Sequence, residues 1–348
     1  MSVETYLRAA PKVELHVHLE GAIRPATVLA LAKRNGVTLP ADDLDGLRRW
    51  FVYRDFDHFV EIYVAITKCL RTAEDYELIA YEFGAEMARQ QVRYAEVTFS
   101  PSTHHALGIP HEVYFGGLTH GRERARAEFG VEIAWVFDIV RSVRATRNQE
   151  FADYVTGVAI EGQADGVVAL GLGGAEVGYP PQSFAPYFER ALATGLHSAP
   201  HAGETVGPES VWGAIHALQA ERIGHGVQSI ADPALVAYLV EHGIPLEVCV
   251  TSNLRLGVYP DVAAHPLARL REAGVVVTIN SDDPPLFNTT LNDEVLLLHT
   301  AFGLDVAAID EILLAGVRHS FLPMARKQTL EQQFRDELDA LKGKELQA

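Results

Sequence analysis

The chain has 348 residues, of which 46 are acidic and 29 basic, so its formal net charge is −17. Such an acidic chain repels a phosphate backbone, which argues against a nucleic-acid partner. Hydrophobic residues make up 48% and charged residues 22%, a globular composition that excludes a disordered chain.

Cysteine use and hydropathy predict a cytoplasmic protein. The two cysteines, Cys69 and Cys249, lie far apart and form neither a disulfide framework nor a Cys-x-x-Cys metal motif. Residues 1–11 lack the pattern of a targeting peptide, and no apolar run reaches the roughly 18 residues of a membrane span. We therefore expect a protein of a reducing compartment with no membrane contact. The sequence leaves the oligomeric state open.

Eight short β-rich apolar runs recur along the chain, separated by stretches with helical periodicity. This alternation is typical of a parallel sheet covered by helices. The predicted strands are Val13–His18, Tyr94–Phe99, Glu132–Val140, Val167–Leu172, His197–His201, Arg222–Gly226, Pro245–Val250 and Val275–Ser281. No linker divides the chain, so we expect one barrel domain over residues 1–348.

The stretches between the runs predict helices. Residues 73–90 place apolar side chains at three- and four-residue spacing, and residues 231–242 do so after an Asp-Pro start. The connection between the first two runs is much longer than the others and predicts several helices. We expect it to form a cap, at about residues 20–90, over one mouth of the barrel. Residues 328–348 predict a charged terminal helix.

Titratable residues gather where the predicted strands end, which is where parallel barrels carry their chemistry. Any one of them alone would be an ordinary loop residue, but their convergence on one face predicts a site. They are His16, His18, His201, Glu204, His225, Asp282 and Asp283.

A metal site follows from four of these residues. His16 and His18 are two apart on a strand, so both point to the same face, and neutral imidazoles there would bind a divalent metal. His201 and Asp282 are the natural third and fourth ligands of a zinc ion. No lysine lies between Lys68 and Lys327, so no lysine can bridge two metals. We expect one zinc ion per chain.

Two further strand-end residues would move protons. Glu204, three residues after His201, would donate a proton to a substrate ring nitrogen if its pocket raises its pKa. Alternatively, Glu204 is a carboxylate at a helix N-terminus. His225 would accept the proton of the attacking water and orient that water. The Pro-Cys-x-x-Cys pattern of cytidine-type zinc deaminases does not occur in the chain, which excludes that architecture.

The motifs together resemble the adenosine and adenine deaminases of the metal-dependent amidohydrolase superfamily. The resemblance spans nearly the whole chain, with motifs at Pro11–Gly21, His201–Glu204, Arg222–Gly226 and Asn280–Pro284. It implies a (β/α)8 TIM barrel in which a zinc-activated water attacks purine C6, ammonia leaves and a 6-oxopurine forms. It also implies a role for each residue in turn: His16, His18, His201 and Asp282 bind zinc, Glu204 protonates N1, His225 assists the water, Asp283 contacts N7, and the backbone of Gly174 contacts N3.

The substrate's substituent is harder to predict. Adenosine deaminases usually carry Asp where this chain has Glu20, at the position that meets the sugar 5′-hydroxyl, whereas adenine-preferring relatives often carry Glu. Arg24 would meet the carboxylate of a 5′-extended adenosine such as aminodeoxyfutalosine, or it is a surface residue at a helix start. Phe59 and Tyr63 belong to an apolar helical stripe that resembles the family's lid; packing on the barrel is the alternative.

The leading hypothesis is therefore zinc-dependent deamination of a small-molecule 6-aminopurine, with adenosine or a related adenine nucleoside first. Aminodeoxyfutalosine, of a menaquinone pathway, and adenine are the alternatives. A barrel metallohydrolase of an ester, amide or lactone is more remote, as is a catalytically silent binding relative, because no residue of the expected set is missing.

Overall fold

The computed structural model describes residues 1–141 and 148–343. Eight parallel strands pair in chain order, and each overlaps one predicted run. They are β1 (Lys12–His18), β2 (Val92–Phe99), β3 (Glu132–Val140), β4 (Val167–Gly173), β5 (His197–Ala202), β6 (Ile223–His225), β7 (Leu246–Val248) and β8 (Val277–Ile279).

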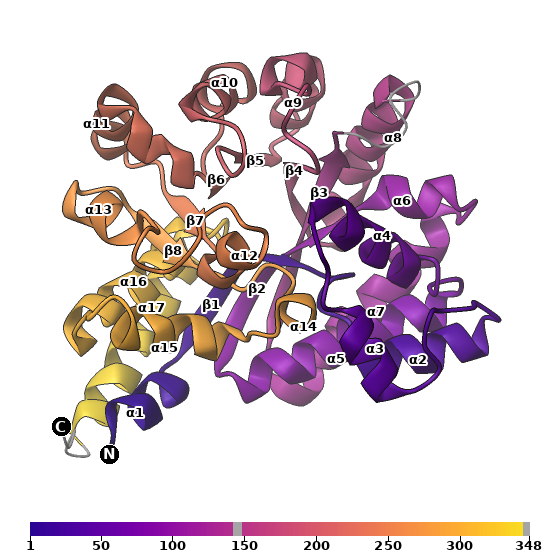
Figure 1. Ribbon diagram of the computed structural model, residues 1–348, viewed down its shortest axis with the longest axis horizontal. Helices are drawn as coiled ribbons and strands as arrows, with labels where there is room; N and C mark the ends of the chain where they lie inside the picture. The colour runs from indigo at the N-terminus through magenta and orange to yellow at the C-terminus, as the bar shows by residue number, and fades with distance from the viewer. Residues whose placement is uncertain (142–147, 344–348) are drawn as a thin grey trace.

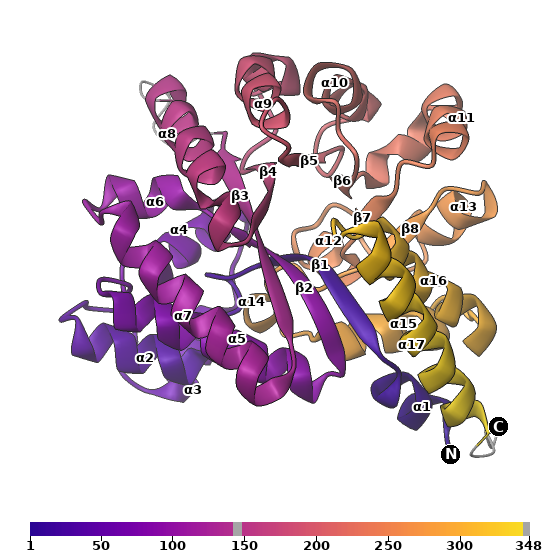
Figure 2. The same ribbon diagram turned by 180° about the vertical axis from the view of Figure 1, so that it is seen from behind.

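The ring of strands closes where β1 meets the segment that follows β8. Val17 forms a parallel bridge with Asp282. The amide of His18 donates to the carbonyl of Asp282 at 2.9 Å, and the amide of Asp282 donates to the carbonyl of His16 at 3.0 Å. Figures 1 and 2 show the strands at the centre and the helices around them. The predicted (β/α)8 TIM barrel is confirmed.

Helices after successive strands form the outer layer. They are α5 (Ala73–Arg89), α7 (His111–Phe129), α8 (Asn148–Glu161), α9 (Ala185–Leu192), α10 (Pro208–Leu218), α11 (Pro233–His242), α13 (Leu267–Glu272) and α16 (Val306–His319). The Asp-Pro start predicted for α11 is present, since the Asp232 side chain accepts from the amides of Ala234 and Leu235. α5 and α7 pack closely, because a Cβ on Gly117 would lie 2.2 Å from the carbonyl oxygen of Ala73.

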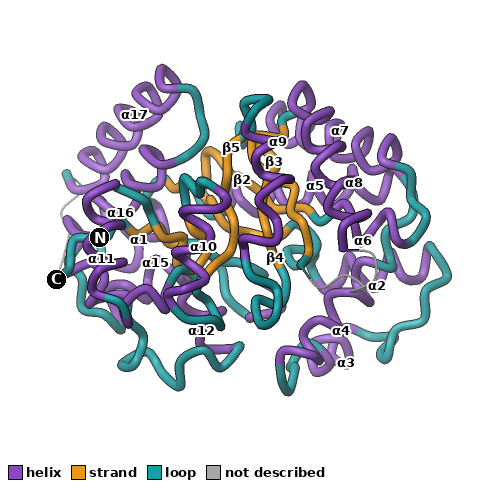
Figure 3. The backbone as a smooth tube through the Cα atoms, turned by 90° about the horizontal axis from the view of Figure 1, so that it is seen from above, coloured by secondary structure: helices purple, strands orange, loops and turns teal. Residues whose placement is uncertain are grey.

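The long connection after β1 supplies a layer of helices beside the barrel mouth. It holds α2 (Pro25–Arg34), α3 (Leu44–Trp50) and α4 (Phe56–Thr67) before α5 begins. Figure 3 shows α3 and α4 on the same side of the strands as α12 (Val250–Arg255), which follows the carboxyl end of β7. These helices thus lie on the side where the strands end.

Shorter elements and the termini complete the fold. They are α1 (Val3–Ala9), α6 (Pro101–Ala106), α14 (Pro284–Phe287), α15 (Leu291–Thr300), α17 (Met324–Lys342) and the 3-10 turns η1 (Gly162–Asp165), η2 (Pro181–Phe184) and η3 (Val227–Ala231). The predicted terminal helix is α17, although residues 344–348 lie outside the described part of the chain. Within that part, no helix combines the length and apolarity of a membrane span.

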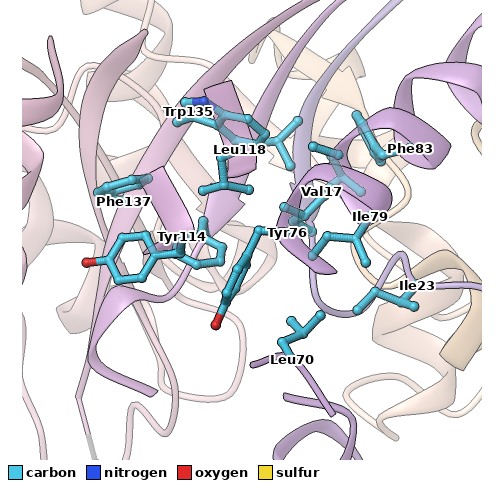
Figure 4. Packing of buried hydrophobic residues seen from close by; sticks show 14 of the residues in the cluster. Val17, Ile23, Leu70, Tyr76, Ile79, Phe83, Tyr114, Leu118, Trp135 and Phe137 are labelled. Atoms are coloured by element: carbon cyan, nitrogen blue, oxygen red, sulfur yellow. The ribbon is translucent and has the colours of Figure 1, made fainter. Parts of the chain in front are cut away.

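Buried apolar clusters pack the helices against the strands. Figure 4 shows side chains of α5 and α7, among them Tyr76 and Leu118, packed against Trp135 and Phe137 of β3. All four are at most 1% exposed. Each large aromatic buries roughly 150–250 Å², so this packing makes the barrel a rigid support for its loops.

Candidate active site

Four predicted residues meet at the carboxyl ends of the strands. His16 and His18 come from β1, His201 from β5, and Asp282 from the segment after β8. One ligand atom from each lies within 4.8 Å of the others. The Nε2 atoms of His16 and His18 lie 3.5 and 3.3 Å from Oδ1 of Asp282, and Nε2 of His18 lies 3.3 Å from Nε2 of His201.

The chemistry of this metal cluster, as we call the four residues, fits a divalent ion. A tetrahedral ion with bonds of about 2.0–2.1 Å holds its ligand atoms roughly 3.3–3.4 Å apart, which matches these separations. Nε2 of His16 is buried and has no hydrogen-bond partner among the described residues. Burial disfavours charge on His16 and His18, but the carboxylates beside them raise their pKa values to about 10 and 9. Burial and these two rings hold the pKa of His201 well below its usual value, so that ring is neutral. A divalent ion would bind in place of the protons on His16 and His18.

Two of the five described non-glycine residues with a positive φ lie at this site. Asp282 and His225 have φ angles of 63° and 58°, in the left-handed region that costs a non-glycine residue about 1 kcal/mol or more. The surrounding hydrogen bonds therefore hold both side chains in conformations that the isolated chain would avoid.

A buried charge network behind His16 escaped the sequence analysis. Nδ1 of His16 lies 3.0 Å from Oε2 of Glu247, whose other oxygen accepts from Arg222, and Arg222 also pairs with Glu96. A carboxylate on Nδ1 fixes the proton there and turns the Nε2 lone pair toward the cluster. The available signal was the presence of charged residues inside two predicted apolar strands, since Glu96 lies in β2 and Glu247 in β7.

Glu204 lies beside the metal cluster with a free oxygen. Its Oε1 is 3.7 Å from Nε2 of His225 and has no hydrogen-bond partner in the described part of the chain. Burial, together with the negative charges of Asp282 and Glu176, raises the pKa of Glu204 to about 8. α10 begins only after Gly207, so Glu204 is not in the first turn of a helix.

Asp283 is a second buried carboxyl group with an unpartnered oxygen. Burial and the adjacent charge of Asp282 raise the pKa of Asp283 well above its usual value, which favours its protonated form. Its Oδ1 has no partner among residues 1–141 and 148–343. Gly21 makes room for it, since a Cβ there would lie 1.7 Å from that oxygen. Across the barrel, Gly174 follows β4 with an exposed backbone and a φ of 79°.

Hydrogen bonds settle which nitrogen of His225 carries the proton. The amide of Leu267 donates to Nδ1 of His265 at 3.3 Å, so neutral His265 has its proton on Nε2. That nitrogen donates to Oδ1 of Asn253 at 3.1 Å, and Nδ2 of Asn253 then donates to Nδ1 of His225 at 3.2 Å. Burial lowers the pKa of His225 to about 4, so the ring is neutral and its proton lies on Nε2, facing Glu204.

The two predicted cap residues have different surroundings. Phe59 stacks on Phe287 of α14, with ring centroids 5.4 Å apart, and joins the cap to the segment after β8. Tyr63 lies nearer the metal cluster, because its ring is 6.4 Å from that of His18 and its hydroxyl donates to Oε2 of Glu20 at 3.2 Å.

Glu20 is fully buried, and the protein itself supplies donors to both of its oxygens. Besides Tyr63, the amide of Ser100 and Nε2 of His104 lie 3.1 and 3.0 Å from its Oε1. Arg24 has a different setting: it is the N-cap residue of α2 and pairs with Glu82 at 2.5 Å, with its side chain 46% exposed. This is the helix-start position that was the alternative for Arg24.

Comparison with known proteins identifies a family and several relatives. The model of the adenosine deaminase family matches residues 11–337. An aminodeoxyfutalosine deaminase of Streptomyces avermitilis is 42% identical over 325 residues, covering 93% of this chain and 90% of the relative.

Two solved structures share the fold. An adenine deaminase from Arthrobacter aurescens has a TM-score of 0.88 and 31% identity, covering 95% of this chain and all of the other (100%). An amidohydrolase from Burkholderia ambifaria with bound Zn has a TM-score of 0.89 and 27% identity, covering 98% of this chain and 94% of the other.

Proposed function

Because the chain belongs to the adenosine deaminase family, we propose that it hydrolyses the 6-amino group of an adenine ring carried by a 5′-extended nucleoside, aminodeoxyfutalosine, with one zinc ion as cofactor. Family membership makes the chain a hydrolase of C–N bonds and supports adenine-type deamination. The observation that carries the proposal is the pair of carboxyl groups, Glu204 and Asp283, each with a buried oxygen that has no partner among the described residues.

The four residues of the metal cluster would hold the zinc ion. Their three imidazoles and one carboxylate are a donor set that zinc favours, and the buried Nε2 of His16 otherwise lacks a partner. When bound, the ion supplies a water whose pKa falls from about 15.7 to about 7. Glu247 would keep His16 in the tautomer that such an ion needs.

Two carboxyl groups with raised pKa values suit a purine, because N1 and N7 of an adenine ring accept hydrogen bonds and a protonated carboxyl group can donate one. Glu204, whose pKa is raised to about 8, would give its proton to N1 as water adds at C6. Asp283 would donate to N7, and the backbone of Gly174 would contact N3. Protonation of N1 draws electrons from C6. Of the two protons of the attacking water, one would pass to the 6-amino group, which leaves as ammonia, and the other would return to the Glu204 carboxylate as the 6-oxo group forms.

His225 would orient the attacking water. Since the proton of neutral His225 lies on Nε2, the ring donates a hydrogen bond at this stage and has no lone pair there to take a proton. Orientation of the water by His225 agrees with the role predicted from sequence, and acceptance of the water's proton by His225 stays a prediction.

The choice of nucleoside rests on the relative of Streptomyces avermitilis, an aminodeoxyfutalosine deaminase that is 42% identical. Adenine is the second candidate, because Glu20 replaces the usual Asp and already accepts from Tyr63, Ser100 and His104. Arg24 is not part of the proposal, because its guanidinium already pairs with Glu82.

A substrate panel tests the proposal. Ammonia release is measured with zinc-loaded protein on adenine, adenosine, AMP and aminodeoxyfutalosine, and kcat/KM is compared. We expect aminodeoxyfutalosine to be preferred at least about tenfold over adenosine, with AMP poorest because the chain is acidic. Preference for adenine would replace the proposed substrate, and no ammonia from any of the four would refute the proposed reaction.

A further inference from the structure

One buried carboxylate outside the metal cluster accepts an unusual number of hydrogen bonds. Glu176 follows β4 and is 4% exposed. Its Oε1 accepts from the amide of Gly203 at 2.8 Å and from Oγ of Ser210 at 2.7 Å. Its Oε2 accepts from the amides of Glu204, Thr205 and Val206 at 3.0, 2.7 and 3.0 Å, and from Oγ1 of Thr205 at 3.2 Å.

Four consecutive backbone amides, of residues 203–206, therefore point at a single anion. These amides lie between β5 and α10, outside helix and strand, and need a partner from elsewhere in the fold. A buried amide without one costs about 1–3 kcal/mol. Burial raises the pKa of Glu176, but the amides and Ser210 outweigh it and the net pKa is lowered, so Glu176 stays charged.

The loop that Glu176 holds carries Glu204. Further hydrogen bonds hold this loop and the residue before it: Arg141 donates to the carbonyl of His201, and the amide and Nε2 of Gln228 donate to the carbonyls of Gly203 and Glu204 at 2.9 and 3.3 Å. The backbone of Glu204 is thus fixed at its amide by Glu176 and at its carbonyl by Gln228. A side chain on so constrained a backbone has few places to put its carboxyl group.

The same carboxylate joins this loop to the segment after β4. Gly174 lies two residues before Glu176 on that segment, and its backbone would meet N3 of the purine. N1 and N3 lie on the same six-membered ring. A fixed spacing between the two loops would set both contacts at once.

We infer that Glu176 is a positioning residue for the deamination: it holds the loop of residues 203–206 so that Glu204 meets N1 while Gly174 meets N3. The inference rests on the proposed function. The same geometry assigns no direct contact between Glu176 and the substrate, because its oxygens are occupied by protein donors.

Three variants test separately the charge of Glu176, the length of its side chain and the contribution of one of its hydrogen-bond donors. Glu176→Gln keeps the shape but loses the charge and turns an amide toward donors. Glu176→Asp keeps the charge but withdraws it by one methylene. Ser210→Ala is the matched control, because it removes one donor to Glu176 and leaves the four backbone amides. Each is measured for metal content, thermal unfolding, kcat, KM, the pH profile of kcat/KM, and hydrogen exchange at residues 203–206.

The positioning account expects one zinc per chain in all variants. In Glu176→Gln, kcat falls roughly 10²-fold, as for an ångström-scale misplacement of a catalytic group. Exchange at residues 203–206 quickens. The alkaline limb of the pH profile moves about one unit lower, because a negative charge near Glu204 is lost. In Glu176→Asp, kcat also falls, but the alkaline limb of the pH profile stays where it is in the parent. In Ser210→Ala, kcat stays within about fivefold of the parent value.

A purely structural role predicts something else: a lower unfolding temperature with unchanged kcat and pH profile in the folded fraction. That result would overturn the inference, and so would a parent-like kcat in Glu176→Asp. The measurement on Glu176→Asp remains a test even if Glu176→Gln fails to fold. A parent protein that releases no ammonia from any 6-aminopurine would instead refute the proposed function. In that case, hydrogen exchange at residues 203–206 in the parent and in Glu176→Gln would still test whether Glu176 orders this loop.

Discussion

Replacing Glu247 by Gln tests whether the network behind His16 prepares it for a metal. In the parent, Oε2 of Glu247 lies 3.0 Å from Nδ1 of His16, and both side chains are less than 5% exposed. In Glu247→Gln, the side-chain amide oxygen can still accept from Nδ1 of His16. Its NH2 group then faces the guanidinium of Arg222, so that two hydrogen-bond donors oppose each other. If the amide turns the other way, it donates to Nδ1 and the Nε2 lone pair is lost.

Either arrangement weakens the site. Loss of such a partner typically costs 10–100-fold in metal affinity, which is about 1.4–2.7 kcal/mol. The assay is competition for zinc between the protein and a chromophoric chelator at fixed pH, with unfolding of the metal-free protein followed in parallel.

A matched control lies elsewhere on the barrel. Nδ1 of His197 lies 3.0 Å from Glu221, the same type of pair, but the two side chains are 38% and 44% exposed. Glu221→Gln should leave the zinc affinity unchanged. Parent-like affinity in Glu247→Gln, or an equal loss in Glu221→Gln, would refute the reasoning.

Three further predictions concern catalysis and stability. Glu204→Gln should keep its zinc and lose roughly 10²–10⁴-fold in kcat, and full activity in this variant would remove Glu204 from the mechanism. In the parent, the protonated form of Glu204 acts, so kcat/KM should fall as the pH rises through the raised pKa of Glu204, about 8. In Gly21→Ala, the new Cβ would lie 1.7 Å from Oδ1 of Asp283 and should displace that side chain. We expect kcat/KM to fall roughly 10²-fold with the metal content unchanged, and parent-like kinetics would contradict this. Tyr6→Phe removes the hydroxyl that donates to both oxygens of buried Asp310, at 2.8 and 2.9 Å. Calorimetry should show a free energy of unfolding about 1–3 kcal/mol lower, while kcat stays unaltered. An unchanged free energy of unfolding would show that this hydrogen bond is dispensable.

The barrel could be predicted from sequence because its signals are local. Alternating apolar runs and helical stretches mark all eight strands, and an Asp-Pro start marks α11 where it begins. The polar strand ends were equally visible, and the structure brings His16 and Asp282 together across the closure of the barrel. Neither inference needed knowledge of how distant segments pack.

The supporting residues could not be predicted, because their function depends on contacts between distant segments. Glu176 meets backbone amides about 30 residues away, and an amide has no signature in a sequence. Glu247 meets His16 from the other end of the chain. The proton of His225 depends on a relay through Asn253 and His265 that only the folded chain assembles. The pairing of Arg24 with Glu82 likewise depends on contacts that only the folded chain makes.

The central claim, that this chain deaminates an adenine ring with solvent water, can be tested directly by isotope labelling. Zinc-loaded protein is incubated with aminodeoxyfutalosine in oxygen-18 water, and product mass and ammonia are measured together. The account predicts a 6-oxopurine product carrying one labelled oxygen, with one ammonia released per product, and both formed roughly 10²–10⁴-fold more slowly in Glu204→Gln. Unchanged substrate, or a product cleaved elsewhere with the 6-amino group intact, would contradict it.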